Sequence, residues 1–318
     1  MLPDTGGSSD IVRSMRGKRL VPLLFVASLV VLALPQAGTA GTPVDPNTHD
    51  TILGTTGGIR YATDSAVYEA SNNNFIDVEA GCGGPNWHLF GGGSLASGGV
   101  AKSFDEADRP DDYLDADTNL DDGWLADAIG TPPAKLHAYT ACMKHAATYP
   151  FQDLPNDSSG NRTASIACPG TQRVTQGSMF IATVNSWITS SYPYDGPDKD
   201  TIPDDGWRGS VFDTLGGIGG FSDYAICSKG LKLHYFKSPP TKVKVKSAGT
   251  VKVPCTPDQH VVGGGERLTG TQSTGRLIGS FPYDGPDKGK IPDDGWQTKV
   301  YNLGGGPKQL TGFAICIG

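Results

Sequence analysis

Residues 191–207 read SYPYDGPDKDTIPDDGW, and residues 280–296 read SFPYDGPDKGKIPDDGW, so the two stretches agree at 14 of 17 positions. A third, more diverged copy ends in Asp-Asp-Gly-Trp at residues 121–124. Repetition at a fixed spacing is the signature of a chain built from similar structural units. The sequence therefore predicts three copies of one fold unit.

The six cysteines divide into three pairs, and one copy of the repeated stretch lies between the two members of each pair. The pairs, each about 60 residues apart, are Cys82 and Cys142, Cys168 and Cys227, and Cys255 and Cys316. Two symmetric pairings fit this repetition: a disulfide within each copy, or a ring of disulfides between copies. We favour disulfides within the copies, because each would close a long loop and stabilise its own unit by about 4 kcal/mol.

The local patterns are typical of β-strands in a loop-rich protein with 44 glycines and 23 prolines. Residues 296–301 alternate, which places Trp296, Thr298 and Val300 on one face, and residues 241–246 alternate with lysine at every second position. We expect the Asp-Asp-Gly before each tryptophan to form a turn in which glycine takes a positive φ. No stretch after residue 40 shows a helical period over three turns, so the predicted fold class is all-β.

The repeats also define the expected organisation of the chain. A basic stretch, an apolar run and a small-residue end predict a signal peptide over residues 1–40, with an uncleaved anchor as the alternative. Repeat 1 with an N-terminal extension then covers residues 41–147, repeat 2 covers 148–233 and repeat 3 covers 234–318. We predict three tandem disulfide-linked β-sandwich-like repeats, with a single pseudo-threefold β-prism as the alternative. No later stretch is expected to span a membrane, so the predicted localisation is secreted or cell-surface.

A recurring frame runs through the repeats: a first cysteine, a glycine cluster, a Ser-aromatic-Pro step, Gly-Trp, and an aromatic residue followed by Ala-Ile-Cys. This frame covers about residues 59–318 and resembles a module of uncharacterised secreted proteins of actinobacteria, often present in single copy. The resemblance implies export and independent folding and assigns no activity. A second, architectural resemblance is to the vitelline-membrane outer-layer protein, in which three disulfide-bearing repeats form one β-prism.

Charge and loop composition bear on the function. The formal net charge is −7, and such a balance argues against a nucleic-acid partner, since phosphate binding depends on clustered lysine and arginine. The repeated loops combine tyrosine, aspartate, glycine and proline, a composition that recognition loops favour. We predict a secreted non-enzymatic extracellular or cell-surface binding protein that contacts a glycan or a protein partner through these acidic aromatic loops.

The predicted ligand-binding residues are the aromatic and acidic side chains of the two similar loops. They are Tyr194, Asp195, Asp198, Asp204, Asp205 and Trp207 in one loop, and Tyr283, Asp284, Asp287, Asp293, Asp294 and Trp296 in the other. The tryptophans could stack on a sugar, but a strand tryptophan in a small disulfide-linked sandwich is more often a core residue packed on the disulfide. The tyrosines are the better candidates for an exposed contact surface.

Calcium is the one ion that the residue pattern suggests. Asp115, Asp117, Asn119 and Asp121 offer oxygen ligands at alternate positions in repeat 1. The spacing is not that of an EF-hand, because Leu120 stands where that loop requires glycine, and a solvated acidic loop is the alternative reading. No other cofactor is predicted.

Two alternatives belong to other function classes. A secreted glycoside hydrolase would use paired carboxylates such as Asp204-Asp205 and Asp293-Asp294 in one deep pocket. Adjacent side chains point apart, however, and threefold repetition predicts equivalent loops, so no catalytic residue is assigned. A structural envelope component would have no saturable ligand. The glycine clusters at 91–93 and 263–265 lack a following Gly-Lys-Ser/Thr and predict a bulge or a close approach of strands.

Overall fold

The computed structural model describes residues 51–67, 75–84, 86–97, 104–111, 122–129, 134–154, 160–181, 186–196, 198, 200–214, 220–270, 274–286 and 289–318. The predicted signal peptide, residues 1–40, lies outside this part of the chain. The secondary-structure elements assigned to these residues are all β-strands, and none of the described residues belongs to a helix long and apolar enough to cross a bilayer. The predicted all-β class is confirmed.

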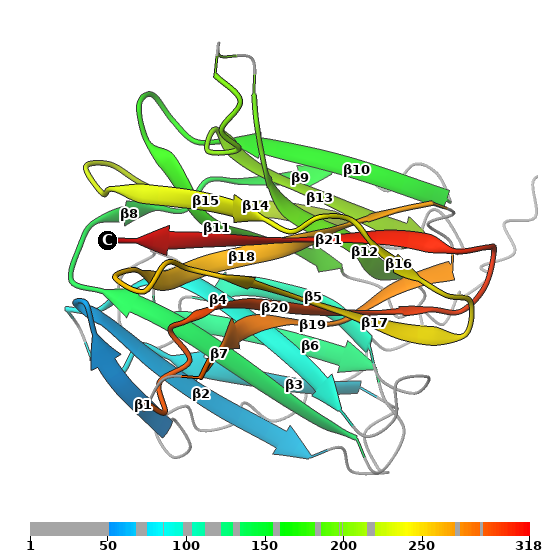
Figure 1. The fold of residues 1–318 in the computed structure, drawn as a ribbon, viewed down its shortest axis with the longest axis horizontal. Coiled ribbons are helices and arrows are strands. Elements are labelled where there is room, and N and C mark those ends of the chain that lie inside the picture. The colour runs from blue at the N-terminus through cyan, green and yellow to red at the C-terminus, as the bar shows by residue number, and fades with distance from the viewer. Residues whose placement is uncertain are drawn as a thin grey trace, which may run out of the picture. The chain divides into compact units, whose positions relative to one another are not determined.

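The strands follow one another in three groups that match the three repeats (Figure 1). The first group is β1 (Thr51–Thr56), β2 (Ile59–Val67), β3 (Phe75–Gly81), β4 (His88–Ser97), β5 (Phe104–Asp111), β6 (Gly123–Ile129) and β7 (Lys135–Met143). The second is β8 (Ala147–Thr148), β9 (Phe151–Leu154), β10 (Gly160–Ala167), β11 (Arg173–Ile181), β12 (Ser186–Tyr194), β13 (Gly206–Asp213) and β14 (Phe221–Ser228). The third is β15 (Leu233–Lys237), β16 (Thr241–Val243), β17 (Ser247–Pro254), β18 (His260–Thr269), β19 (Gly275–Tyr283), β20 (Gly295–Asn302) and β21 (Lys308–Ile317).

One disulfide closes each repeat. The bonds are Cys82–Cys142, Cys168–Cys227 and Cys255–Cys316, with Cα–Cα distances of 5.7, 5.7 and 5.9 Å. These are the pairings within the copies, and the alternative ring between copies is therefore excluded. The predicted repeat boundaries, 147/148 and 233/234, fall inside β8 and β15, which pair with β14 and β21 of the repeat that follows each boundary.

The repeats share their sheets. In repeat 3, β17-β20-β19 form one half-sheet and β15-β21-β18 form the other, and the remaining repeats follow the same plan. Half-sheets of different repeats then join: β12 pairs with β18, where Ser191 faces Glu266, and β19 pairs with β4, where Ser280 faces Ser94. Strand β5 of repeat 1 lies beside β11 of repeat 2. Two of the sheets therefore contain strands from more than one repeat.

A tryptophan packs against a glycine inside each repeat. All three indoles are at most 1% exposed. The pairs are Trp124 with Gly92, Trp207 with Gly177, and Trp296 with Gly264. A Cβ atom on any of these glycines would overlap the indole, so glycine leaves the space that the ring fills. The ladder also bulges just before two of these glycine clusters, between Leu89 and Gly91 and between Val261 and Gly263, as the sequence predicted.

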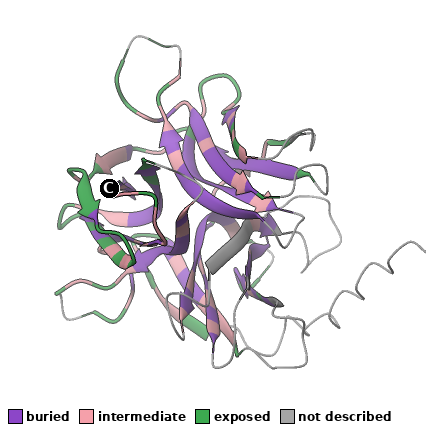
Figure 2. Ribbon diagram, turned by 90° about the vertical axis from the view of Figure 1, so that its right-hand side faces the viewer, coloured by how far each residue is buried: buried purple, intermediate pink, exposed green. Residues whose placement is uncertain are grey.

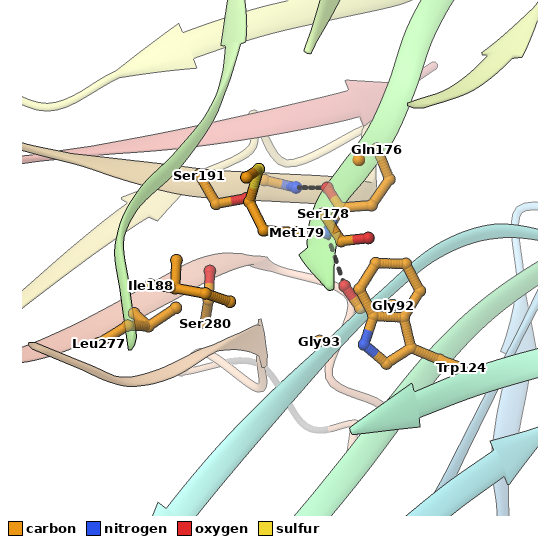
Figure 3. A pocket seen from close by; sticks show the side chains of 12 residues that line it. Gly92, Gly93, Trp124, Gln176, Ser178, Met179, Ile188, Ser191, Leu277 and Ser280 are labelled. Atoms are coloured by element: carbon orange, nitrogen blue, oxygen red, sulfur yellow. Dashed lines mark hydrogen bonds between the residues drawn. The ribbon is translucent and has the colours of Figure 1, made fainter. Parts of the chain in front are cut away.

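The glycine clusters of different repeats meet at the centre. A Cβ on Gly91 would overlap the carbonyl oxygen of Val262 in repeat 3. Repeat 2 has Gln176 at this position, and its Nε2 donates to the Gly92 carbonyl at 2.6 Å while its Oε1 accepts from the Gly264 amide at 2.9 Å (Figure 3). One side chain therefore bonds to the two other repeats. The neighbouring cavity is about 10 Å³, room for about one water molecule, so it cannot hold a small-molecule ligand.

The largest hydrophobic cluster draws on all three repeats, for example Phe90 from repeat 1, Trp207 from repeat 2 and Trp296 from repeat 3. Figure 2 shows that the buried residues follow the strands, whereas exposed residues gather on the connecting loops. Trp296, Thr298 and Val300 all point into the core, at 0–1% exposure, as their alternation predicted. On the other face, Lys299 and Tyr301 are partly exposed, whereas Gln297 is buried as well.

Two local expectations from the sequence are wrong. The glycine of Asp-Asp-Gly-Trp does not have a positive φ in any repeat. Glycine is needed there for close packing instead, because a Cβ on Gly206 or Gly295 would lie 2.8 Å from the ring of Tyr194 or Tyr283. The lysine-rich alternation is also shorter than expected: it forms only β16, and Val245 beyond it is 43% exposed.

The glycine under an indole can be tested directly. Gly264→Ala should lower the free energy of unfolding by about 2–3 kcal/mol, because the added methyl group must displace the Trp296 ring or the Phe313 carbonyl. Gly304→Ala is the matched control, since nothing lies within 4 Å of a Cβ at that position. Chemical unfolding followed by tryptophan fluorescence measures both, and equal midpoints for the two variants would contradict the packing described here.

Candidate functional site

Stacked aromatic pairs mark two seams between repeats. Where β12 meets β18, the rings of Tyr192 and Phe313 have centroids 5.6 Å apart and planes inclined by 17°. Where β19 meets β4, the rings of Phe281 and Tyr139 are 5.5 Å apart with an angle of 19°. Each pair joins one repeat to its neighbour. Both positions belong to the repeated frame, the aromatic residue before proline and the one three residues before the second cysteine, but the sequence did not indicate that they meet.

An open groove of about 470 Å³ lies over the seam of β12 and β18. Its lining includes both stacked rings together with Tyr194, Asp195, Pro193, Pro203, Arg208, Lys237 and Arg267. A second hollow of about 250 Å³ shares Tyr192, Arg208 and Arg267 with the first and extends to Thr163 and Gly270. The two hollows adjoin at these three shared residues, and we call them together the seam groove.

Two arginines stand over the aromatic rings of the seam groove. The guanidinium carbon of Arg208 is 4.8 Å from the Tyr194 ring centroid, and its Nε donates to Ser165 Oγ at 2.7 Å. The guanidinium carbon of Arg267, an exposed residue, is 5.7 Å from the Tyr192 centroid. Cations over aromatic faces are held by the ring quadrupole. Within the described part of the chain, neither arginine forms an ion pair.

The structure places the predicted tyrosines at the edge of the core. Tyr194 and Tyr283 are half-buried, and burial raises the pKa of both phenols. Asp195, which lines the seam groove, is exposed, as are Asp198 and Asp284. Asp287 lies outside the described residues. Tyr194 and Asp195 are thus the predicted residues that the structure brings to the groove.

The paired aspartates of the first loop have partners within the fold. Asp204 is buried, and its Oδ2 lies 3.0 Å from Nε of Arg173. Burial nevertheless raises the pKa of Asp204, with the Arg173 charge acting in the opposite direction. Asp205 Oδ2 accepts a hydrogen bond from the Gly196 amide at 2.6 Å and so fixes the start of the loop.

The second loop has the same arrangement, with a histidine in place of the arginine. Asp293 Oδ2 lies 2.6 Å from Nδ1 of His260, and Asp294 Oδ2 accepts from the Gly285 amide at 2.5 Å. Burial raises the pKa of Asp293, and the hydrogen bond from His260 acts against that shift. In both loops the adjacent carboxylates face different partners, as expected for neighbours along the chain. Each holds the loop in place.

The predicted role of Trp207 and Trp296 in stacking on a ligand does not fit their position. Both indoles are buried, and each Nε1 donates to a serine Oγ at 2.8 Å, Ser191 and Ser280 respectively. No face of either ring is open to solvent. The structure places them among the core residues, the alternative that the sequence also offered.

The four predicted calcium ligands, Asp115, Asp117, Asn119 and Asp121, lie outside the described residues. In the described part, carboxylate oxygens lie within 4.8 Å of one another in two groups: Asp195, Asp198 and Asp205, and Asp198, Asp200 and Asp204. Asp198 and Asp200 accept hydrogen bonds from the amides of Asp200 and Ile202, at 2.9 and 2.7 Å. These turns within the loop account for the position of both carboxylates.

Asp223 on β14 is a buried carboxyl group that the sequence did not single out. Its side chain is inaccessible to solvent, and burial raises its pKa well above the usual range, against the opposing effect of Arg208. A carboxyl group whose pKa is raised in the folded state favours folding less as the pH rises. Asp223 therefore reduces stability at neutral pH.

The variant Asp223→Asn tests whether the buried carboxyl group destabilises the folded state at neutral pH. The free energy of unfolding should rise at pH 7 by about 1–3 kcal/mol, because the amide avoids the cost of burying a charge. The gain should shrink as the pH falls and level off below about 3.9, because the carboxyl is then protonated in both the folded and the unfolded state. Exposed Asp77→Asn changes the net charge equally and should leave stability unchanged. Urea unfolding at several pH values measures both, and a less stable Asn variant at pH 7 would refute the assignment.

No protein-family model matches the chain, and the search of curated proteins finds no significant relative. The function is therefore argued from the geometry of the seams and loops.

Proposed function

We propose that this chain is a secreted, non-enzymatic protein that binds an extracellular glycan along its outer seams. The observation that supports this function is the seam groove, an open depression whose lining includes the half-buried Tyr192 and Tyr194 and the edge of the buried Phe313. Carbohydrate sites use aromatic faces for the apolar side of the sugar ring and polar groups for its hydroxyls. The seam groove offers both.

The shape of the surface suits a polymer better than a single small molecule. The two hollows share Tyr192, Arg208 and Arg267, so neighbouring sugars of one chain would reach both of them. The seam of β19 and β4 carries a second stacked pair, and Tyr283 occupies the loop position that Tyr194 occupies in the first. Two weak contacts on one rigid body bind a long polymer by avidity.

Three disulfides support an extracellular location, since such bonds persist mainly outside the reducing cytosol. The signal peptide predicted over residues 1–40 points in the same direction. Disulfides also suit a protein exposed to conditions in which an unfolded chain would be degraded.

The loop carboxylates weigh against the hydrolase alternative. A glycosidase needs one carboxyl group as acid and another as nucleophile or base, both facing the substrate. Asp204 and Asp293 are instead paired with Arg173 and His260, and the neighbouring aspartates bind backbone amides. A protein partner and a purely structural role remain the competing outcomes of the binding test below.

Removing the tyrosines tests the proposed function. Tyr194→Ala and Tyr283→Ala should each weaken binding to a cell-wall polysaccharide by about 10-fold, and the double variant should abolish it, because each change removes one of two aromatic contacts. Affinity electrophoresis through gels that contain the polysaccharide gives the retardation directly. Phe151→Ala removes an aromatic side chain that is 57% exposed on β9 and should have no effect.

Two results would contradict the proposal. One is the absence of saturable binding to any polysaccharide, which is the result expected for a structural component. The other is binding that the double tyrosine variant retains in full. Thermal unfolding of each variant verifies that it is folded.

A further inference from the structure

We infer that the seam groove selects a carboxylate-bearing polysaccharide, of the uronic-acid type, over its neutral counterpart, and that Arg208 and Arg267 bind the carboxylates. This inference rests on the proposed glycan-binding function and adds the chemical class of the ligand. Its support comes from the comparison of two seams that share one backbone plan.

The stacked rings are common to both seams, but the arginines are not. In the ladder of β12 and β13, Tyr192 faces Arg208, whereas its counterpart Phe281 faces Gln297 in the ladder of β19 and β20. The second arginine also has no counterpart. Arg267 follows Glu266, which faces Ser191 across the first seam. The equivalent position in the other seam is Leu95, which follows Ser94, the residue that faces Ser280. The seam of β19 and β4 is therefore joined by an aromatic pair although neither equivalent position is an arginine. The two arginines are an additional feature of the seam of β12 and β18.

Arg208 is held ready to bind an anion. Its Nε is bonded to Ser165 and its guanidinium lies over Tyr194, so its position is set from two sides. Among the described residues, its terminal nitrogens donate no further hydrogen bond and meet no carboxylate at ion-pair distance. Those nitrogens are the ones that form a bidentate pair with a carboxylate.

The charge of the groove opposes that of the whole chain. Arg208, Arg267 and Lys237 line it, and Asp195 is the one carboxylate among its lining residues. The chain as a whole carries a net charge of −7. A positively charged groove attracts anions to itself, whereas the rest of an acidic protein surface repels them. Together with the aromatic lining residues, it fits a sugar polymer that bears carboxylates.

The other seam supplies a matched control. Its rings are also approached by cations, with Lys252 Nζ at 4.4 Å from the Tyr283 centroid and Lys299 Nζ at 5.4 Å from the Phe281 centroid. Lysine ammonium groups are compact point charges that do not bind a carboxylate in a bidentate manner. Removing the two lysines changes the net charge as much as removing the two arginines. The lysines also lie over the equivalent aromatic rings.

The test compares galacturonic-acid oligomers with the same oligomers after complete methyl esterification, which removes the charge and keeps the sugar. Isothermal titration should show that the intact protein binds the acid form at least about 10-fold more tightly, and the preference should fall as salt is added. R208Q/R267Q should bind both forms equally, at the level of the ester. R208K/R267K should keep only part of the preference, and K252Q/K299Q should keep all of it.

Three results would overturn the inference: an unchanged acid preference in R208Q/R267Q, equal binding of acid and ester by the intact protein, or equally tight binding of dextran sulfate, which would show general attraction to polyanions. These results are distinct from failure of the proposed function. If the ester binds and Tyr194→Ala weakens it, the glycan function stands and only the acid selectivity fails. If neither form binds but another polysaccharide does, the acid selectivity fails and the glycan function stands; if no polysaccharide binds, both proposals fail.

Discussion

An indole seated over a glycine of the opposing half-sheet is the contact on which the rest of the structure depends. Because Gly92, Gly177 and Gly264 have no side chain, each tryptophan can fill the space between the two half-sheets of its repeat. The flanking glycines allow the backbones of neighbouring repeats to approach at the centre, where Gln176 bonds to the two others. Burial of three tryptophans also supplies a large share of the hydrophobic stabilisation.

The outer surface follows from this interior. Sheets that continue from one repeat into the next bring Tyr192 beside Phe313 and Phe281 beside Tyr139. Each of these surfaces is built from two repeats, so neither exists in a single copy. The seam groove is thus a product of the way the repeats combine, and a change that loosens the centre should also disturb the surface that we propose for binding.

The sequence predicted the features that depend on local pattern. The all-β class, the inward face of Trp296, Thr298 and Val300, and the close approach at the glycine clusters all follow from alternation and residue size. It could not predict the site, because Arg208 and Arg267 belong to different repeats and no local pattern connects them. Their counterparts Gln297 and Leu95 also differ in chemistry, so the repetition did not draw attention to them. Abundant aspartates favoured the loops as the site, whereas Asp204, Asp205, Asp293 and Asp294 have partners within the fold.

Shared sheets and a shared core imply that the three repeats unfold together. Differential scanning calorimetry of the oxidised chain measures this through the ratio of the calorimetric to the van't Hoff enthalpy of unfolding. One cooperative body predicts a single transition with a ratio near one. Three separate units of similar stability would give a ratio of about three, and that result would contradict the account of repeats joined through the centre.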